Sequence, residues 1–163
     1  MNLNNNLHCV NCGTRLEQNE NQIKYCPNCK VEQYDPYFSA VSMLVLNQAQ
    51  DKVLIIRHPA DDYFRLVAGY VDKFENLEDC LFRELKEETG LVPLRYWYNH
   101  SKYFPKSNTL MVNFVVLVDE NQNIEFNEEI AEASWVSFDT AQERLSSALT
   151  ASFFLENYLR NKL

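Results

Sequence analysis

Three glutamates lie close together in the sequence: Glu84, Glu87 and Glu88. In an α-helix, residues three and four positions apart share one face, so these carboxylates project from the same side. They also lie near the C-terminal end of the helix, where the helix dipole disfavours negative charge. Such crowding destabilises a helix unless a cation offsets it, and clusters of carboxylate oxygens suit magnesium or manganese. The pattern predicts either a divalent-metal site suited to phosphate chemistry or a solvated acidic face.

The residues around the glutamates predict a helix that begins after Asn76 and ends before Gly90. Asparagine is a favourable N-cap residue, and glycine is common immediately after the last residue of a helix. One face of this helix is apolar in its first turns and acidic in its last, whereas an ordinary surface helix keeps its inward face apolar. The side chains expected to be buried are Cys80, Leu81, Phe82 and Leu85.

The wider spacing in this segment carries more information than the helix alone. Gly69, Glu75 and the run from Arg83 to Leu91, RELKEETGL, resemble the signature of the Nudix hydrolases at every defined position. The resemblance implies a loop–helix–loop that binds a divalent metal and hydrolyses a diphosphate joining a nucleoside to another group. Cleavage of a P–O–P bridge requires charge neutralisation and a positioned, deprotonated water, and metal ions supply both.

The same resemblance implies a role for each matching position. The catalytic positions are Glu75, Arg83, Glu84, Glu87 and Glu88. Glu84 and Glu88 would bind the magnesium or manganese ion, and the glutamate between them would help to bind or position it. Arg83 would orient the carboxylates through a two-point contact, and Glu75 would support the helix. Gly69 would let the backbone approach the metal closely.

Four cysteines near the N-terminus form a second pattern. Cys9 and Cys12 make one Cys-x-x-Cys pair, Cys26 and Cys29 make another, and residues 13–25 separate them. This spacing predicts a tetrahedral zinc site of the ribbon type. The alternatives are two disulfides or a redox pair, but a cytosolic chain rarely keeps disulfides and a redox motif does not come as a matched pair. Because so short a segment cannot build a hydrophobic core, zinc would supply its folding energy.

Composition limits the remaining classes of function. The chain has 163 residues, of which 46% are hydrophobic and 13% aromatic, enough for one globular domain and a small appendage. We expect a zinc ribbon over residues 1–35 and a hydrolase domain over residues 36–163. The net charge of −8 argues against a general binder of nucleic acid or anionic membranes. The chain has no apolar run long enough to span a membrane and no signal-peptide pattern, which predicts a cytoplasmic protein.

The elements that would position these residues can be predicted from the apolar runs. Strands are expected over residues 38–46, 53–57, 64–68, 94–104, 110–118 and 135–138, with residues 106–108 in a turn. A final amphipathic helix follows, with Leu145, Leu149, Phe153 and Leu155 facing the core. Helices on both sides of a mixed sheet, an α/β/α sandwich, are the expected architecture. The Nudix resemblance implies the same fold.

A zinc ribbon directly before a Nudix domain resembles the NADH diphosphatase subgroup. Its members split a reduced dinucleotide into nicotinamide mononucleotide and AMP and can remove an NAD cap from RNA. The subgroup array Ser-Gln-Pro-Trp-Pro-Phe-Pro-x-Ser is degraded here, since only Phe104, Pro105 and Ser107 match. Phe104 either stacks on a substrate ring or is a core aromatic. Tyr34 aligns with a tyrosine that borders the substrate pocket, although Asp35 replaces the usual proline.

The subgroup also takes a metal ligand from an acidic residue shortly before a tryptophan. Glu129, before Trp135, is the best match, with Glu128 and Glu132 as rivals. Three hypotheses follow: an NAD(H) diphosphatase, a Nudix enzyme acting on ADP-ribose or FAD, and a non-catalytic protein whose ribbon binds a partner. The resemblance favours the first, with NAD-capped RNA as a further substrate and a homodimer as the assembly.

Overall fold

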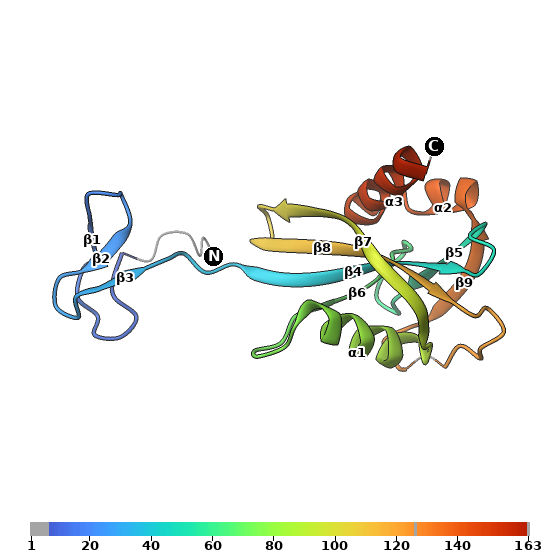
Figure 1. Cartoon of the computed structure of the whole chain (residues 1–163), viewed down its shortest axis with the longest axis horizontal. Coiled ribbons are helices and arrows are strands. Elements are labelled where there is room, and N and C mark those ends of the chain that lie inside the picture. Colours follow the sequence, from blue (N-terminus) through green and yellow to red (C-terminus); the bar gives the residue numbers. More distant parts are fainter. Residues whose placement is uncertain (1–6, 126, 163) are drawn as a thin grey trace. The chain divides into compact units, whose positions relative to one another are not determined.

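The computed structural model describes residues 7–125 and 127–162, and the chain divides into two compact units between Tyr37 and Phe38 (Figure 1). Residues 1–6, on which the expectation of no signal peptide depends, lie outside the described residues. Among the described helices, none is both long and apolar enough to cross a membrane.

The first unit contains a small antiparallel sheet. Its strands, in the order β1-β2-β3, are β1 (Glu17–Gln18), β2 (Lys24–Cys26) and β3 (Val31–Gln33). Among residues 7–37, only Cys9 and Cys26 are buried. Two buried cysteines do not make a hydrophobic core, so burial of apolar surface cannot stabilise this unit by itself.

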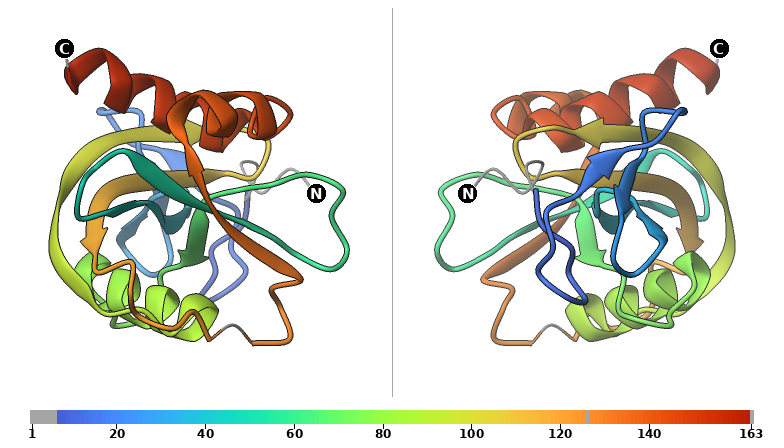
Figure 2. Two further views of the ribbon diagram at one scale, coloured as in Figure 1. Left: turned by 90° about the vertical axis from the view of Figure 1, so that its right-hand side faces the viewer. Right: turned by 90° about the vertical axis from the view of Figure 1, so that its left-hand side faces the viewer.

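The second unit is a mixed sheet between two layers of helix. The sheet has the order β7-β8-β4-β5-β9. Strand β6 also pairs with β4, at residues 40–43. The strands are β4 (Phe38–Asn47), β5 (Lys52–Arg57), β6 (Val67–Tyr70), β7 (Pro93–Phe104), β8 (Thr109–Val118) and β9 (Glu132–Ser137). Only the pairing of β4 with β8 is parallel among these strands. Helix α1 (Leu77–Thr89) covers one face, and α2 (Phe138–Arg144) and α3 (Leu149–Lys162) cover the other (Figures 1 and 2). The predicted α/β sandwich is confirmed.

Strand β4 explains how the two core layers form. Alternate side chains of a strand point to opposite faces. Val41 and Met43 pack with Leu81 on the α1 side, whereas Leu44 packs with Phe154 on the α3 side. A central strand covered on both faces needs a continuous apolar run rather than an alternating one, which accounts for the sequence of residues 38–46.

Two predicted strands differ from the structure by more than one residue at an end. The strand expected at residues 64–68 is β6, Val67–Tyr70, so Gly69 lies within a strand and pairs with Val41 rather than lying in a loop. The last strand extends over Glu132–Ser137, and Phe138 begins α2 because Ser137 caps that helix through the backbone N–H of Thr140.

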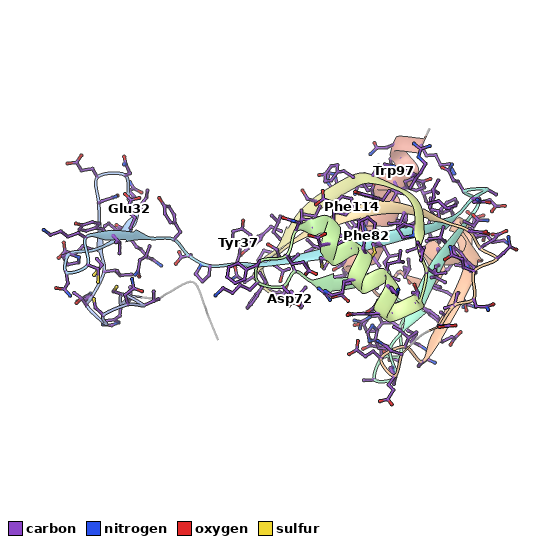
Figure 3. The ribbon with its side chains drawn as sticks, turned by 60° about the horizontal axis from the view of Figure 1, so that its bottom comes forward. Glu32, Tyr37, Asp72, Phe82, Trp97 and Phe114 are labelled. Carbon is purple, nitrogen blue, oxygen red and sulfur yellow. The ribbon has the colours of Figure 1, made fainter. Side chains whose placement is uncertain are left out.

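The predicted final helix is two helices, α2 and α3. Ser146 interrupts the pattern, since its hydroxyl donates to the carbonyl of Glu143 and competes with helical hydrogen bonds. Leu145 and Leu155 are fully buried and Phe153 is half-buried, but the prediction for Leu149 is wrong because it is 78% exposed. The prediction for Phe82 is also wrong: this ring is exposed at the margin of α1, where it packs edge-on against Tyr96 of β7 (Figure 3).

Candidate functional site

Helix α1 has the predicted bounds. Asn76 has extended backbone angles and precedes the first helical residue, although its side chain bonds to Asp79 rather than to a backbone N–H. Gly90 ends the helix in the left-handed conformation, at φ 71°, and its N–H donates to the carbonyl of Lys86. Glycine adopts this conformation without the penalty that a Cβ atom imposes.

A single guanidinium organises the carboxylates of α1. Arg83 donates from Nε and Nη2 to the two carboxylate oxygens of Glu75, at 2.7 and 2.8 Å. Its Nη1 donates to Glu84 at 2.6 Å and to Glu87 at 3.3 Å. Three carboxylates around one cation leave a net negative charge, as a cation-binding site requires. The arrangement supports an orienting role for Arg83.

Glu75 anchors this arrangement to the loop before the helix. Its carboxylate accepts the Arg83 bonds and a hydrogen bond from the backbone N–H of Asp72, at 2.9 Å. The hydrogen bond from Arg83 is the main reason that the pKa of Glu75 falls to about 2. Glu75 is therefore charged at neutral pH and ties loop, arginine and helix together.

Gly69 and Glu84 lie in direct contact. The carboxyl carbon of Glu84 is 1.9 Å from the position that a Cβ atom on residue 69 would occupy. Only glycine leaves room for this carboxylate. Burial raises the pKa of Glu84, and Arg83 opposes that rise.

We expect Gly69→Ala to lower catalytic activity at least about tenfold, because the new methyl group displaces the Glu84 carboxylate that Arg83 otherwise holds. Steady-state hydrolysis at saturating magnesium measures the effect. Gly13→Ala in the first unit adds the same methyl group in open space, so turnover should be retained although its φ of +72° strains that turn. Unchanged turnover in Gly69→Ala would show that the contact has no part in catalysis.

Glu88 is the most deeply buried acid of the site. It is 3% exposed, and its Oε2 has no hydrogen-bond partner among the described residues. Its Oε1 lies 3.9 Å from Nε2 of His58. Burial, assisted by the neighbouring charge of Glu84, raises the pKa of Glu88 to about 8. Because an unpartnered buried carboxylate oxygen is costly, its presence fits a divalent cation bound at this point.

The structure distinguishes the three acidic residues before Trp135. Glu129 lies close enough to Glu88 and His58 to raise the pKa of both groups. Glu132 instead forms an ion pair with Arg57 at 3.3 Å, whereas Glu128 and Glu129 are both exposed. This placement favours Glu129 as the acid that joins the α1 carboxylates.

A cavity of about 320 Å³ lies beside the start of α3, and no acidic residue is among the described residues that line it. Strands β4, β6 and β8, the segment before β6, the connection from α2 to α3 and the first turn of α3 form its walls. The lining residues include Arg65 and Ala68, both of which lower the pKa of Glu88 and therefore lie near it. Sequence reasoning missed Arg65 and His58, since neither belongs to a motif. The one signal was their position shortly before Gly69.

The residues of the degraded array lie elsewhere. Phe104 is half-buried and packs edge-on against Phe154 of α3, with ring centroids 6.5 Å apart. Pro105 and Ser107 are exposed in the turn after β7, and none of the three is among the residues that line the cavity. This packing favours the core interpretation of Phe104. Tyr34 belongs to the first unit, where it is 71% exposed and donates to Glu32.

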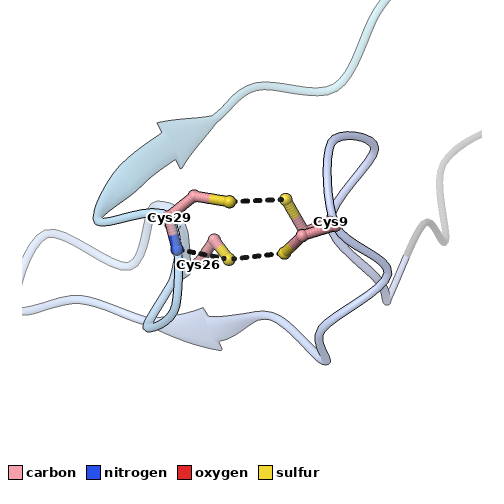
Figure 4. Close-up of side chains that lie close together, drawn as sticks. Cys9, Cys26 and Cys29 are labelled. Carbon is pink, nitrogen blue, oxygen red and sulfur yellow. Dashed lines mark hydrogen bonds between the residues drawn. The ribbon is translucent and has the colours of Figure 1, made fainter.

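The four cysteines of the first unit converge on one point. The sulfurs of Cys9 and Cys29 are 3.9 Å apart, and those of Cys12 and Cys26 are 3.6 Å apart (Figure 4). All four sulfurs lie within 4.8 Å of one another, and all are free thiols. Zinc–sulfur bonds of about 2.3 Å in a tetrahedron place the sulfurs about 3.8 Å apart, so the spacing fits zinc.

The two cysteine pairs adopt the same turn. The N–H of Gly13 donates to the carbonyl of Cys9 at 2.9 Å, and the N–H of Lys30 donates to that of Cys26 at 2.8 Å. Both donors have positive φ, 72° for Gly13 and 58° for Lys30. Further donors face the sulfurs: the N–H of Cys29 bonds to Cys26 Sγ, and Gln33 bonds to Cys9 Sγ. Such donors stabilise thiolates that bind a metal.

Comparison with known proteins agrees with this geometry. The NUDIX domain family model matches residues 36–156. An NAD-capped RNA hydrolase NudC from Pseudomonas aeruginosa (strain LESB58) is 31% identical over 160 residues, covering 96% of this chain and 57% of that protein. The protein of the same name from Vibrio vulnificus (strain CMCP6) is 29% identical over 158 residues, covering 94% and 59%. The chain thus spans less than two thirds of the length of these relatives.

Solved structures show the same fold. A NUDIX hydrolase from Nitrosomonas europaea superposes with a TM-score of 0.64 at 19% identity, covering 78% of this chain and 91% of that one. The NUDIX domain of Shewanella oneidensis NrtR, complexed with ADP ribose, gives a TM-score of 0.62 at 17% identity, covering 85% and 94%. At these identities the likeness concerns the fold.

Proposed function

Because the chain belongs to the Nudix family, we propose that it is a metal-dependent hydrolase that splits the diphosphate of NADH or NAD into nicotinamide mononucleotide and AMP. The buried, unpartnered Oε2 of Glu88, beside the carboxylates that Arg83 organises, is the observation that carries this proposal. A solvated acidic face would not bury a carboxylate without a partner. The NAD-capped RNA hydrolases among the relatives support a substrate that contains NAD.

The acidic residues of the site would bind the metal, and Arg83 and Glu75 would hold them in place. Glu84, Glu88 and Glu129 would hold magnesium or manganese, with Gly69 leaving room beside Glu84. When bound there, such an ion would supply charge neutralisation for the diphosphate and activation of a water molecule. Arg83 orients Glu84 and Glu87, and Glu75 holds Arg83 in place.

The cavity lined by Arg65 and Ala68 is large enough for one end of the dinucleotide, and an NAD cap on RNA presents the same end. A Nudix enzyme acting on ADP-ribose or FAD is the second candidate. The packing of Phe104 against Phe154 favours it, because this ring is then not a stacking surface for nicotinamide.

The cysteine cluster would hold one structural zinc ion per chain through Cys9, Cys12, Cys26 and Cys29. Four free thiols suit a reducing compartment, which supports a cytoplasmic location. The homodimer implied by the Nudix resemblance stays a prediction for a measurement of mass in solution.

We expect the purified protein to release AMP and a nicotinamide mononucleotide in equal amounts from NADH and NAD when magnesium or manganese is present. From NAD-capped RNA it should release nicotinamide mononucleotide and leave a 5′-monophosphorylated RNA. A panel containing these substrates, ADP-ribose and FAD, analysed by chromatography with and without chelator, measures the preference. Preference for ADP-ribose by a wide margin would favour the second candidate. Absence of any diphosphate cleavage at saturating metal would contradict the enzymatic proposal.

A further inference from the structure

The cavity lined by Arg65 and Ala68 contains a buried hydroxyl group, that of Ser42. Ser42, in the middle of β4, is 2% exposed and lines the cavity. Its neighbours on the same face of β4 are apolar, including Leu44 and Leu46. A buried hydroxyl in an otherwise apolar strand needs hydrogen-bond partners, and their direction determines what the cavity can bind.

A relay of two asparagines reaches Ser42 from the edge of the sheet. Strand β7 has a bulge at Asn99, because the register passes from Tyr98 opposite Phe114 to His100 opposite Asn113. Bulges often redirect a side chain. Asn99 Nδ2 donates to Asn113 Oδ1 at 2.9 Å, and Asn113 Nδ2 donates to Ser42 Oγ at 3.1 Å. Asn113 is fully buried and lies opposite Ser42 in the parallel pairing of β8 with β4.

The hydrogen bond that Asn99 makes with α3 determines the orientation of both asparagine amides. Asn99 Nδ2 also contacts the main-chain carbonyl of Phe154 in α3, at 3.1 Å. A carbonyl oxygen has no hydrogen and can only accept, so the group facing it must be the NH₂ of Asn99. The atom of Asn113 that meets this same NH₂ must then be its oxygen. The NH₂ of Asn113 therefore faces Ser42, which accepts the bond and keeps its hydroxyl proton.

That proton makes Ser42 a donor toward the cavity. No described residue accepts a hydrogen bond from the Ser42 hydroxyl. Arg65 also lines this cavity, and its guanidinium has N–H donors besides the Nη2 group that donates to Asp61 and Tyr63. A buried hydroxyl proton without an acceptor, such as that of Ser42, is costly unless a ligand or water accepts it.

We propose that Ser42 and Arg65 form a donor-lined subsite that binds the hydrogen-bond acceptor edge of a heteroaromatic base, with Asn99 and Asn113 as positioning residues. The inference rests on the proposed dinucleotide substrate. It adds which protein groups recognise one of the two ends of that dinucleotide. The carboxamide oxygen of nicotinamide and the ring nitrogens of adenine both offer such an acceptor. Ser42 is then a specificity-determining residue.

Binding of the two reaction products to metal-free protein tests this subsite. We expect Ser42→Ala to weaken binding of either nicotinamide mononucleotide or AMP about five- to tenfold, the effect of losing one neutral hydrogen bond. The other product should bind as before, because it contacts a different part of the protein. Titration calorimetry in the presence of chelator measures both constants, and the product that responds identifies the end held by the cavity.

Two matched variants separate recognition from folding. Ser42→Thr keeps the hydroxyl and should retain affinity within about twofold. Ser39→Ala makes the same change three residues earlier on β4, on the face opposite Ser42 by strand alternation, and should leave both constants unchanged. A destabilised fold would weaken both products together. Equal weakening of both, or no weakening in Ser42→Ala, overturns the proposal, as does failure of both products to bind the wild-type protein.

If nicotinamide mononucleotide is the product that responds, its acid analogue tests the direction of the relay. Nicotinic acid mononucleotide offers two acceptor oxygens and no donor, so a donor-lined subsite should bind it at least as tightly as the amide. Binding more than about tenfold weaker would mean that Ser42 acts as an acceptor and would overturn the assignment. These binding measurements do not require the enzyme to turn over substrate. If the protein hydrolyses the dinucleotide but Ser42→Ala binds both products normally, only the proposed subsite is contradicted. Ser42-dependent binding without hydrolysis contradicts only the proposed activity.

Discussion

Replacing Glu88 with glutamine is expected to reduce the rate of diphosphate hydrolysis about a thousandfold at saturating magnesium. The change keeps the shape of the side chain but removes the charge of a proposed metal ligand, and a metal contributes several kcal/mol to such a reaction. Measurement of AMP release under single-turnover conditions isolates the chemical step. Glu78→Gln is the matched control, since Glu78 lies in the exposed first turn of α1 and should retain full activity.

The same substitution should stabilise the metal-free fold. Burial raises the pKa of Glu88 from its ordinary value of 4.5 to about 8. A carboxyl group whose pKa is raised by folding destabilises the protein as the pH rises from about 4.5 to about 8, and at pH 7 the cost is roughly 3 kcal/mol. Glu88→Gln removes this cost, so its unfolding free energy in chelator should exceed that of the wild type at pH 7 and converge with it near pH 4. Full activity at saturating magnesium would refute the metal-ligand role of Glu88.

Changing Cys26 to serine is expected to abolish stoichiometric zinc binding and to unfold the first unit. Structural zinc contributes on the order of 10 kcal/mol to the folding of such small domains, and few other interactions replace it here. Cys26 is one of only two buried side chains among residues 7–37. Elemental analysis of the purified protein measures zinc, and limited proteolysis should cleave the first unit rapidly while leaving the second unit intact.

Cys80→Ser provides the matched control for this experiment. Cys80 is also fully buried, but it lies in α1 of the second unit, so the variant should keep about one zinc per chain. The wild-type protein should show four thiolates that react only after zinc is removed. Purified wild-type protein that lacks zinc and holds its cysteines in disulfides would contradict the ribbon assignment.

Local spacing explains why much of the site was predictable. Asn76 and Gly90 bound a helix through their own backbone preferences, and helical geometry places Glu84 and Glu88 on one face whatever surrounds them. The cysteine pairs are equally local, because each turn closes within a few residues. Leu149 and Phe82 were mispredicted for the complementary reason. Their burial depends on where a helix breaks and on which strand passes beside it, which periodicity does not encode.

The sequence alone determined the chemistry of this protein: the carboxylates of α1, the arginine beside them and the four thiols that converge in the first unit. These groups are close along the chain, so the geometry of a helix or a turn suffices to bring them together. Only the tertiary structure decided what completes the site. Glu129 and His58 reach Glu88, and Ser42 meets Asn113, through the packing and register of strands far apart in sequence. Such contacts depend on how the whole sheet pairs, because each strand places its side chains according to its neighbours rather than its own sequence.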